Sequence, residues 1–107
     1  MSTNPATISN ALSRLWAKFL PEIEIRVGLV AAAASALAAG ELTAEQRVQA
    51  HEAAHKLAGS LGTFGLHRGT ELARRAELAL AEVPVAATVA ELASWVAELQ
   101  SLIRDRG

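Results

Sequence analysis

Apolar residues recur along most of this 107-residue chain at the three- and four-residue spacing of amphipathic helices. Pro and Gly residues, together with Thr residues suited to helix N-termini, interrupt the pattern at intervals. Pro21 is expected to end the first helix, because a proline inside a helix lacks an amide hydrogen and clashes with the preceding turn. The pattern therefore predicts five helices, over residues 5–20, 22–39, 43–62, 66–82 and 88–105.

The last four predicted helices are similar in length and are joined by short connections. Short connections force neighbouring helices to run antiparallel, which predicts an up-down four-helix bundle. The first helix carries an apolar side of its own, made by Ile8, Leu12, Leu15 and Phe19, and is expected to cap the bundle. The predicted fold class is thus all-α, with residues 1–107 forming one antiparallel four-helix bundle and an additional N-terminal capping helix.

The amino-acid composition excludes several classes of fold, partner and chemistry. Hydrophobic residues make up 51% of the chain and aromatic residues only 4%, which favours closely packed helices over sheet. The 10 basic and 11 acidic residues are mixed along the chain, so neither nucleic acid nor an anionic membrane is an expected partner. The absence of cysteine excludes disulfides and thiolate catalysis. With no secretory signal and no apolar stretch near the roughly 20 residues that span a bilayer, a cytoplasmic location is expected.

The segment around His55 carries the candidate chemistry. On a helical wheel the core side of this helix is formed by Ala50, Ala54, Leu57, Leu61 and Phe64. His55 points about 140° away from that side, with Gly59 and Gly62 one and two turns further along its own side. Each glycine costs a helix roughly 0.5–1 kcal/mol relative to alanine. The pattern indicates an exposed imidazole beside open space, or alternatively a helix end that frays towards Gly65.

This segment resembles the histidine-containing phosphotransfer domains of two-component signalling. The matching residues are His55, Leu57, Gly59, Ser60 and Gly65, and the ending Gly62-Thr63-Phe64-Gly65 resembles the chemotaxis-kinase type most closely. The resemblance implies a four-helix bundle with an exposed phosphoacceptor, which agrees with the fold predicted from the spacing. It further implies a phosphorelay intermediate without cofactor, metal or autonomous kinase or hydrolase activity. Such an intermediate exchanges a phosphoryl group between His55 and an aspartate of a response-regulator receiver domain, or a histidine kinase.

The resemblance also assigns expected roles near the phosphoacceptor. Gly59 falls on the small residue that leaves room for the phosphoryl group, and Glu77 on a carboxylate that orients the histidine from the next helix. Ala58 departs from the pattern, because the family usually has a lysine there. Arg74, one turn before Glu77, is the preferred substitute cation. Lys56 is adjacent to His55 but lies about 100° around the helix from it.

Two alternatives remain open at this point. His51-Glu52-Ala53-Ala54-His55 matches the His-Glu-x-x-His pattern of zinc metalloproteases, in which both histidines bind the metal and the glutamate is the base. The extended form of that pattern fails, because Ala58 and Leu61 stand where it requires Gly and a third His. The other alternative is a helical interaction module that is not phosphorylated, which the departure at Ala58 suggests.

Overall fold

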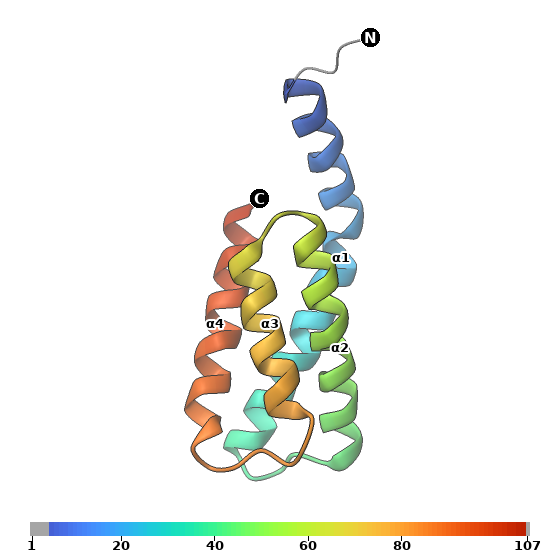
Figure 1. Ribbon diagram of the computed structural model, residues 1–107. Coiled ribbons are helices and arrows are strands. Elements are labelled where there is room, and N and C mark those ends of the chain that lie inside the picture. The colour runs from blue at the N-terminus through green and yellow to red at the C-terminus, as the bar shows by residue number, and fades with distance from the viewer. Residues whose placement is uncertain (1–4, 107) are drawn as a thin grey trace.

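The computed structural model describes residues 5–106, which form four helices and, within that range, no strand. The helices are α1 (Pro5–Ala38), α2 (Ala44–Thr63), α3 (His67–Leu80) and α4 (Thr88–Arg106). Consecutive helices run antiparallel, and α4 returns to pack against α1, which closes the bundle (Figure 1). The predicted all-α, up-down four-helix bundle is confirmed.

The predicted break at Pro21 is wrong, because α1 continues through this residue as a single helix of 34 residues. Pro21 and Ala17, whose carbonyl loses its helical hydrogen bond, both lie on the exposed side of the helix. The buried side continues in phase across the proline, with Trp16 before it and Ile23 seven residues later. A proline inside a helix costs about 3 kcal/mol. Burial of the Trp16 ring, which an unbroken helix directs into the core, offsets much of that cost.

The predicted capping helix over residues 5–20 is also not formed. Instead, the N-terminal turns of α1 extend beyond the end of the bundle (Figure 1). Most of their large apolar residues are exposed, Ile8 by 49%, Leu12 by 37%, Leu15 by 44% and Phe19 by 41%, whereas Trp16 is buried. We call residues 7–19 the α1 extension.

The other helices begin and end within two residues of their predicted limits. Thr43 caps α2, since its hydroxyl oxygen accepts a 3.1 Å hydrogen bond from the Gln46 amide, as the capping-box spacing predicted. Gly40 and Gly65 have φ of 71° and 73° after α1 and α2, a conformation that glycine adopts without strain. The turn at Gly40 connects α1 to α2, and the turn at Gly65 connects α2 to α3.

Small residues bring α2 and α3 close together. Four alanines are fully buried on these two helices: Ala50, Ala54, Ala73 and Ala76. Gly69 of α3 approaches even more closely, because a Cβ atom there would lie 3.0 Å from Leu61 Cδ1. Leucine, isoleucine and valine side chains, together with Trp16, fill the rest of the core, which holds no polar or charged residue within the described range. The two helices that carry the candidate residues are therefore held rigidly against each other.

Candidate functional site

His55 lies in the middle of α2 on the side opposite its buried face. The buried residues of α2 are Ala50, Ala53, Ala54, Leu57, Ala58 and Leu61. The His55 side chain is 72% exposed, as the helical spacing predicted. A partner therefore has direct access to the ring.

Glu77 of α3 orients this ring. Its Oε2 atom lies 2.8 Å from His55 Nδ1, and its side chain is only 24% exposed. A carboxylate only accepts hydrogen bonds, so His55 Nδ1 must carry the proton that it donates to Glu77. This contact leaves Nε2 as the nitrogen with a free lone pair when the ring is neutral, and it selects one tautomer of the imidazole.

A shallow hollow adjoins the ring between α2 and α3. Its lining residues, which define the His55 hollow, are His55, Ala58, Gly59, Arg74, Glu77 and Leu78. Gly59 leaves this hollow open, because a Cβ atom there would meet nothing within 4 Å. The predicted companions Gly59, Arg74 and Glu77 thus gather around His55, while Lys56 and Gly62 do not.

Arg74 is the free cation of this hollow. It makes no hydrogen bond or ion pair with any other residue between 7 and 106. Its neighbours on α3 are engaged: Arg75 Nη2 lies 2.5 Å from Glu71 Oε1, and Arg68 Nε lies 2.6 Å from Glu98 Oε2 on α4. The Glu98 carboxylate raises the pKa of Arg68, and the Arg68 guanidinium holds the pKa of Glu98 below its usual value. Arg74 alone of these three arginines remains available to an anion beside His55.

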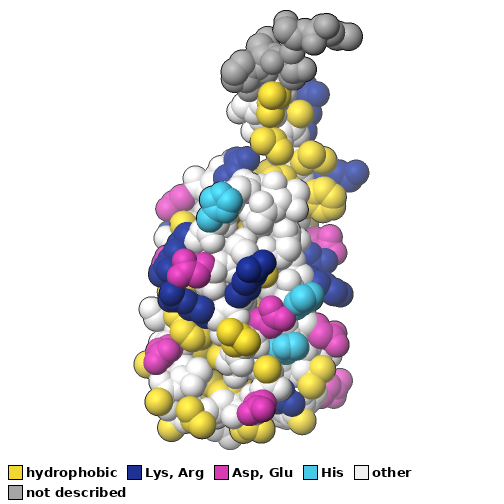
Figure 2. All heavy atoms as spheres, viewed as in Figure 1, with side chains coloured by type: hydrophobic (Ala, Val, Ile, Leu, Met, Phe, Trp, Pro, Cys, Tyr) yellow, Lys and Arg dark blue, Asp and Glu magenta, His cyan; other side chains and the backbone are white. Residues whose placement is uncertain are grey.

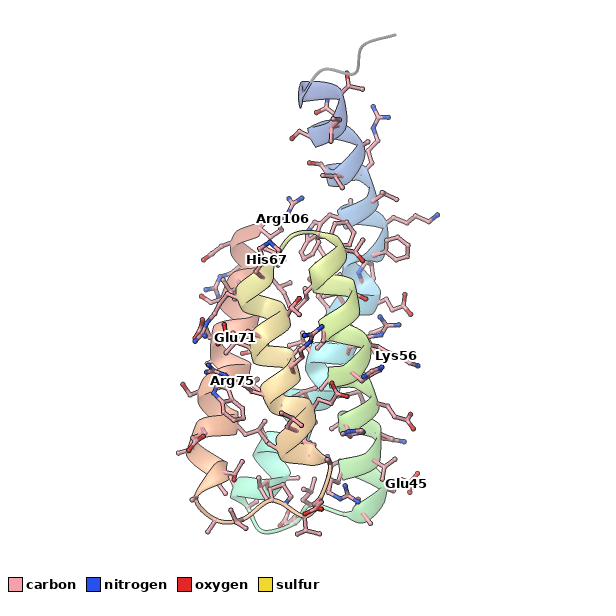
Figure 3. All side chains as sticks on the ribbon, in the orientation of Figure 1. Glu45, Lys56, His67, Glu71, Arg75 and Arg106 are labelled. Carbon is pink, nitrogen blue, oxygen red and sulfur yellow. The ribbon has the colours of Figure 1, made fainter. Side chains whose placement is uncertain are left out.

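Lys56 lies on a different surface from the His55 hollow. It lines a groove between α1 and α2 together with Glu22, Arg26 and Glu52. Figure 3 shows its side chain directed away from α3. The offset of about 100° on the helical wheel accounts for this placement.

Gly62 serves the packing of α2 on α3 rather than the hollow. A Cβ atom at Gly62 would lie 3.4 Å from Thr70 Oγ1, which is a tight contact. The Thr70 hydroxyl donates a 3.1 Å hydrogen bond to the Ala58 carbonyl, and Thr63 donates another of 3.1 Å to the Gly59 carbonyl. These bonds support α2 through the turns that contain both glycines, and the helix runs to Thr63. The helix thus continues through both glycines before the chain turns at Gly65.

Sequence reasoning missed two neighbours of the site. Leu78 is 77% exposed and lines the hollow, although its place on α3 gave no sign of unusual exposure. Thr70 supports the Ala58 carbonyl across the helix interface. The only sequence signal for Leu78 or Thr70 was its position relative to Glu77. Leu78 directly follows Glu77, and Thr70 precedes Glu77 by two helical turns.

The zinc hypothesis gains no support from this geometry. Between residues 5 and 106, no three His, Asp or Glu side chains gather as a metal site would require. His51 is half-buried, and the proton on His55 Nδ1 is directed at Glu77 rather than at a shared ion. Two histidines on one helix without a third ligand do not make a protease centre.

The profile of the Hpt domain matches residues 14–105, which includes the whole bundle and the His55 hollow. This chain belongs to the Hpt domain family. Hpt domains are histidine phosphotransfer modules of two-component signalling rather than enzymes that act alone, and they interact with receiver domains and kinases. The resemblance inferred from the residues around His55 is confirmed at the level of the family, while the similarity to the chemotaxis-kinase type stays a prediction.

One curated relative of this Hpt domain is Protein RcaC of Microchaete diplosiphon. The two are 36% identical over 66 residues, which is 62% of this chain and 10% of that protein. The chain therefore spans about a tenth of the length of this relative. No solved structure gives a significant match. Over the described residues of the Hpt domain, no helix is both long enough and apolar enough to cross a membrane.

The open space at Gly59 leads to a prediction in which stability and function change in opposite directions. Gly59→Leu should raise the free energy of unfolding by about 0.5–1 kcal/mol, because leucine favours the helix and its Cβ atom would meet nothing within 4 Å. The same side chain should cover the hollow and slow phosphoryl transfer from a receiver domain by about tenfold or more. Urea unfolding and a transfer assay measure the two effects separately.

Gly28 supplies the matched control. It is another exposed glycine with no neighbour within 4 Å of a built Cβ atom, and it lies on α1 away from the hollow. Gly28→Leu should stabilise the protein to a similar extent and leave transfer unchanged. Equal transfer rates for the Gly59 and Gly28 variants would contradict a role for Gly59 in keeping the hollow open.

Proposed function

We propose that this Hpt domain is a phosphorelay intermediate that is phosphorylated on His55. It accepts the phosphoryl group from an aspartyl phosphate of a receiver domain or from a histidine kinase, and passes it to a further partner. The observation that carries the proposal is the 2.8 Å contact between His55 Nδ1 and Glu77 Oε2, which leaves Nε2 with the free lone pair on a side chain that is 72% exposed and shares its hollow with Arg74.

The phosphoryl transfer requires few chemical groups of the Hpt domain itself. The lone pair on His55 Nε2 attacks phosphorus, an N–P bond forms, and the P–O bond to the aspartate carboxylate breaks. The released carboxylate takes the electron pair, and the proton on Nδ1 stays between the ring and Glu77. Positive charge that develops on the ring is stabilised by the Glu77 carboxylate. Reversal of the same step returns the phosphoryl group to an aspartate.

Cations stabilise the loose transition state of phosphoryl transfer. The receiver domain brings its own metal-bearing aspartate site, so the Hpt domain needs only to add to it. Arg74 is the residue of this chain that fits that role, because it lines the hollow and has no other partner between residues 7 and 106. In this proposal it replaces the lysine that the family usually has at the position of Ala58.

Loss of Arg74 should therefore slow transfer. A unit charge about 4 Å from a phosphoryl oxygen contributes about 1 kcal/mol in water and about 4 kcal/mol at a typical protein surface. Because Arg74 is exposed, its contribution should lie near the lower of these two energies. We therefore expect Arg74→Ala to slow transfer by about five- to tenfold. Arg74→Lys should retain most of the rate, and raised salt should narrow the gap between wild type and Arg74→Ala. The rates are measured by rapid-quench transfer from a phosphorylated receiver.

Arg75 provides the control for that experiment, since it is an adjacent arginine already paired with Glu71. Arg75→Ala should transfer at the wild-type rate. An Arg74→Ala protein that transfers as fast as Arg75→Ala would remove Arg74 from the proposed site.

The proposal as a whole is tested by mixing the purified domain with receiver domains phosphorylated by acetyl phosphate. We expect loss of label from the receiver and the appearance of acid-labile, base-stable label on the domain. The small donor phosphoramidate tests the histidine without any partner, because its P–N bond breaks and ammonia leaves as His55 is phosphorylated. A domain that binds receivers but takes up no phosphoryl group from either donor would instead be a pure interaction module.

A further inference from the structure

Glu77 lies in the last turn of α3, where the helix supports itself least. The last four carbonyl groups of a helix have no amide partner within it. The cap residue Ala81 keeps right-handed helical dihedral angles, with φ of −63°, and the last turn contains no basic residue. α3 is also short, with 14 residues, and isolated helices shorter than about 12–15 residues are marginal in water. The 2.8 Å contact between Glu77 and His55 therefore depends on another element that holds this turn.

Arg47 of α2 binds the end of α3. Its Nη1 atom donates a 2.8 Å hydrogen bond to the Leu80 carbonyl and a 3.0 Å hydrogen bond to the Ala81 carbonyl. Leu80 follows Glu77 by three residues, so these carbonyls belong to the turn that carries the carboxylate and to its cap. The C-terminal end of a helix carries partial negative charge, which attracts a cation. Arg47 thus caps α3 from the helix beside it (Figure 1).

The surroundings of Arg47 leave α3 as its partner. Figure 2 shows mostly hydrophobic side chains on the surface at this end of the bundle, and Leu37, Leu42 and Val83 line the hollow beside the guanidinium. No carboxylate between residues 7 and 106 pairs with Arg47, whose Nε atom is buried without a partner in that range. Arg47 is also the fourth residue of α2, near an N-terminus whose partial positive charge disfavours a cation. The bonds to α3 are the interactions that offset these costs.

α3 is attached to α2 at both ends, and the His55 hollow lies between the attachments. Thr70, near the start of α3, donates a 3.1 Å hydrogen bond to the Ala58 carbonyl. Arg47 attaches the other end. His55 and Arg47 belong to the same helix, eight residues apart. The bonds of Arg47 therefore fix Glu77 relative to the helix that carries His55.

We propose that Arg47 is a positioning residue, which acts on His55 through Glu77. By holding the last turn of α3, it keeps the Glu77 carboxylate at hydrogen-bonding distance from His55 Nδ1, so the ring stays in the tautomer that leaves Nε2 free. Arg47 does not line the His55 hollow, and we expect it to contact neither the phosphoryl group nor the docked partner. Its effect on phosphoryl transfer rests on the proposed function, whereas its effect on the tautomer does not.

Arg47→Met tests this role, since methionine keeps a long unbranched side chain but donates no hydrogen bond. We expect phosphoramidate to label His55 about threefold more slowly in this variant than in wild type, and faster than in Glu77→Ala, because a displaced carboxylate retains part of its effect. Arg47→Lys should keep most of the rate, because both bonds of Arg47 come from one nitrogen atom, which lysine Nζ can replace. Rates are measured in trimethylamine N-oxide, which favours the folded state, and urea unfolding gives the stability of each variant.

Arg26→Met is the matched control. Arg26 belongs to the part of α1 that packs on α2, C-terminal to the α1 extension, and it is half-buried like Arg47. Its Nη1 atom donates a 3.2 Å hydrogen bond to Ser60 Oγ of α2, so its loss also removes a bond between helices, but not one to α3. Arg26→Met should therefore be labelled at the wild-type rate, even where it is as destabilised as Arg47→Met.

A double-mutant cycle shows whether Arg47 acts through Glu77. In the Glu77→Ala background, Arg47→Met should not slow the labelling of His55 any further. Equal slowing with and without Glu77, or labelling of Arg47→Met as fast as that of Arg26→Met, would overturn the proposal.

The ring tautomer gives a readout that needs no phosphoryl transfer. At about pH 9 an ordinary histidine is neutral, and the ¹⁵N chemical shifts of its ring nitrogens report which of them carries the proton. Wild type and Arg26→Met should show the proton on His55 Nδ1, and Arg47→Met should show a mixture of both tautomers. Wild-type shifts in Arg47→Met would overturn the role of Arg47. A wild-type domain that shows the Nδ1 proton but takes up no label would instead overturn only the proposed function.

Discussion

Replacement of His55 by Gln is expected to abolish phosphorylation of this Hpt domain by both phosphoramidate and a phosphorylated receiver domain. Glutamine preserves size and polarity but has no nucleophilic ring nitrogen. The His55 side chain is 72% exposed and supports no core contact, so the variant should unfold at the same urea concentration as wild type. Loss of labelling without loss of stability, measured by labelling and urea unfolding, is the expected result.

The other two histidines provide the controls. His51→Gln and His67→Gln should both be labelled as fast as wild type, because neither residue lines the His55 hollow. Label that persists in His55→Gln and disappears in one of these variants would move the phosphoacceptor to that residue.

Replacement of Glu77 should have the second largest effect. Hydrogen bonds to charged groups contribute about 1.5–3 kcal/mol, and the partial exposure of this pair places the contribution near the lower value. Since 1.36 kcal/mol corresponds to a tenfold change in rate, Glu77→Gln should slow labelling of His55 by about tenfold. Gln can still accept a hydrogen bond from Nδ1 but brings no negative charge, so Glu77→Ala should be slower still.

Glu71→Gln is the matched control for Glu77, because Glu71 is also a glutamate of α3 but pairs with Arg68 and Arg75. It should label at the wild-type rate. The rate at which phosphoramidate labels His55 distinguishes an effect on the orientation of the ring from an effect on partner docking, since this donor brings no protein surface to the site. If Glu77→Gln slowed only transfer from the receiver, Glu77 would belong to the docking surface instead.

The fold was largely predictable because the apolar spacing determines which side of each helix is buried. The seven-residue spacing from Trp16 to Ile23 already indicated that the helix continues across Pro21. The general rule that a proline ends a helix led to the wrong prediction of a break. The capping role expected for residues 5–20 failed for a different reason. An apolar stripe indicates that something covers it, but it does not indicate whether the same chain provides the cover.

The surroundings of His55 were predictable only in part. The exposure of the ring followed from the position of Leu57 and Leu61 on the wheel. The contact between Glu77 and Nδ1 depends on how far α3 is shifted along α2, which the close approach at Gly69 determines. Helical periodicity contains no information on that shift, and for the same reason it gave no sign of Leu78.

The central claim concerns a single nitrogen atom, and NMR of the phosphorylated domain tests it directly. With ¹⁵N-labelled histidine and phosphoramidate as donor, ³¹P–¹⁵N correlation identifies the nitrogen bonded to phosphorus. We predict a single phosphohistidine, His55, with phosphorus on Nε2 and the Nδ1 proton retained towards Glu77. Phosphorus on Nδ1 of His55, or on His51 or His67, would contradict the account.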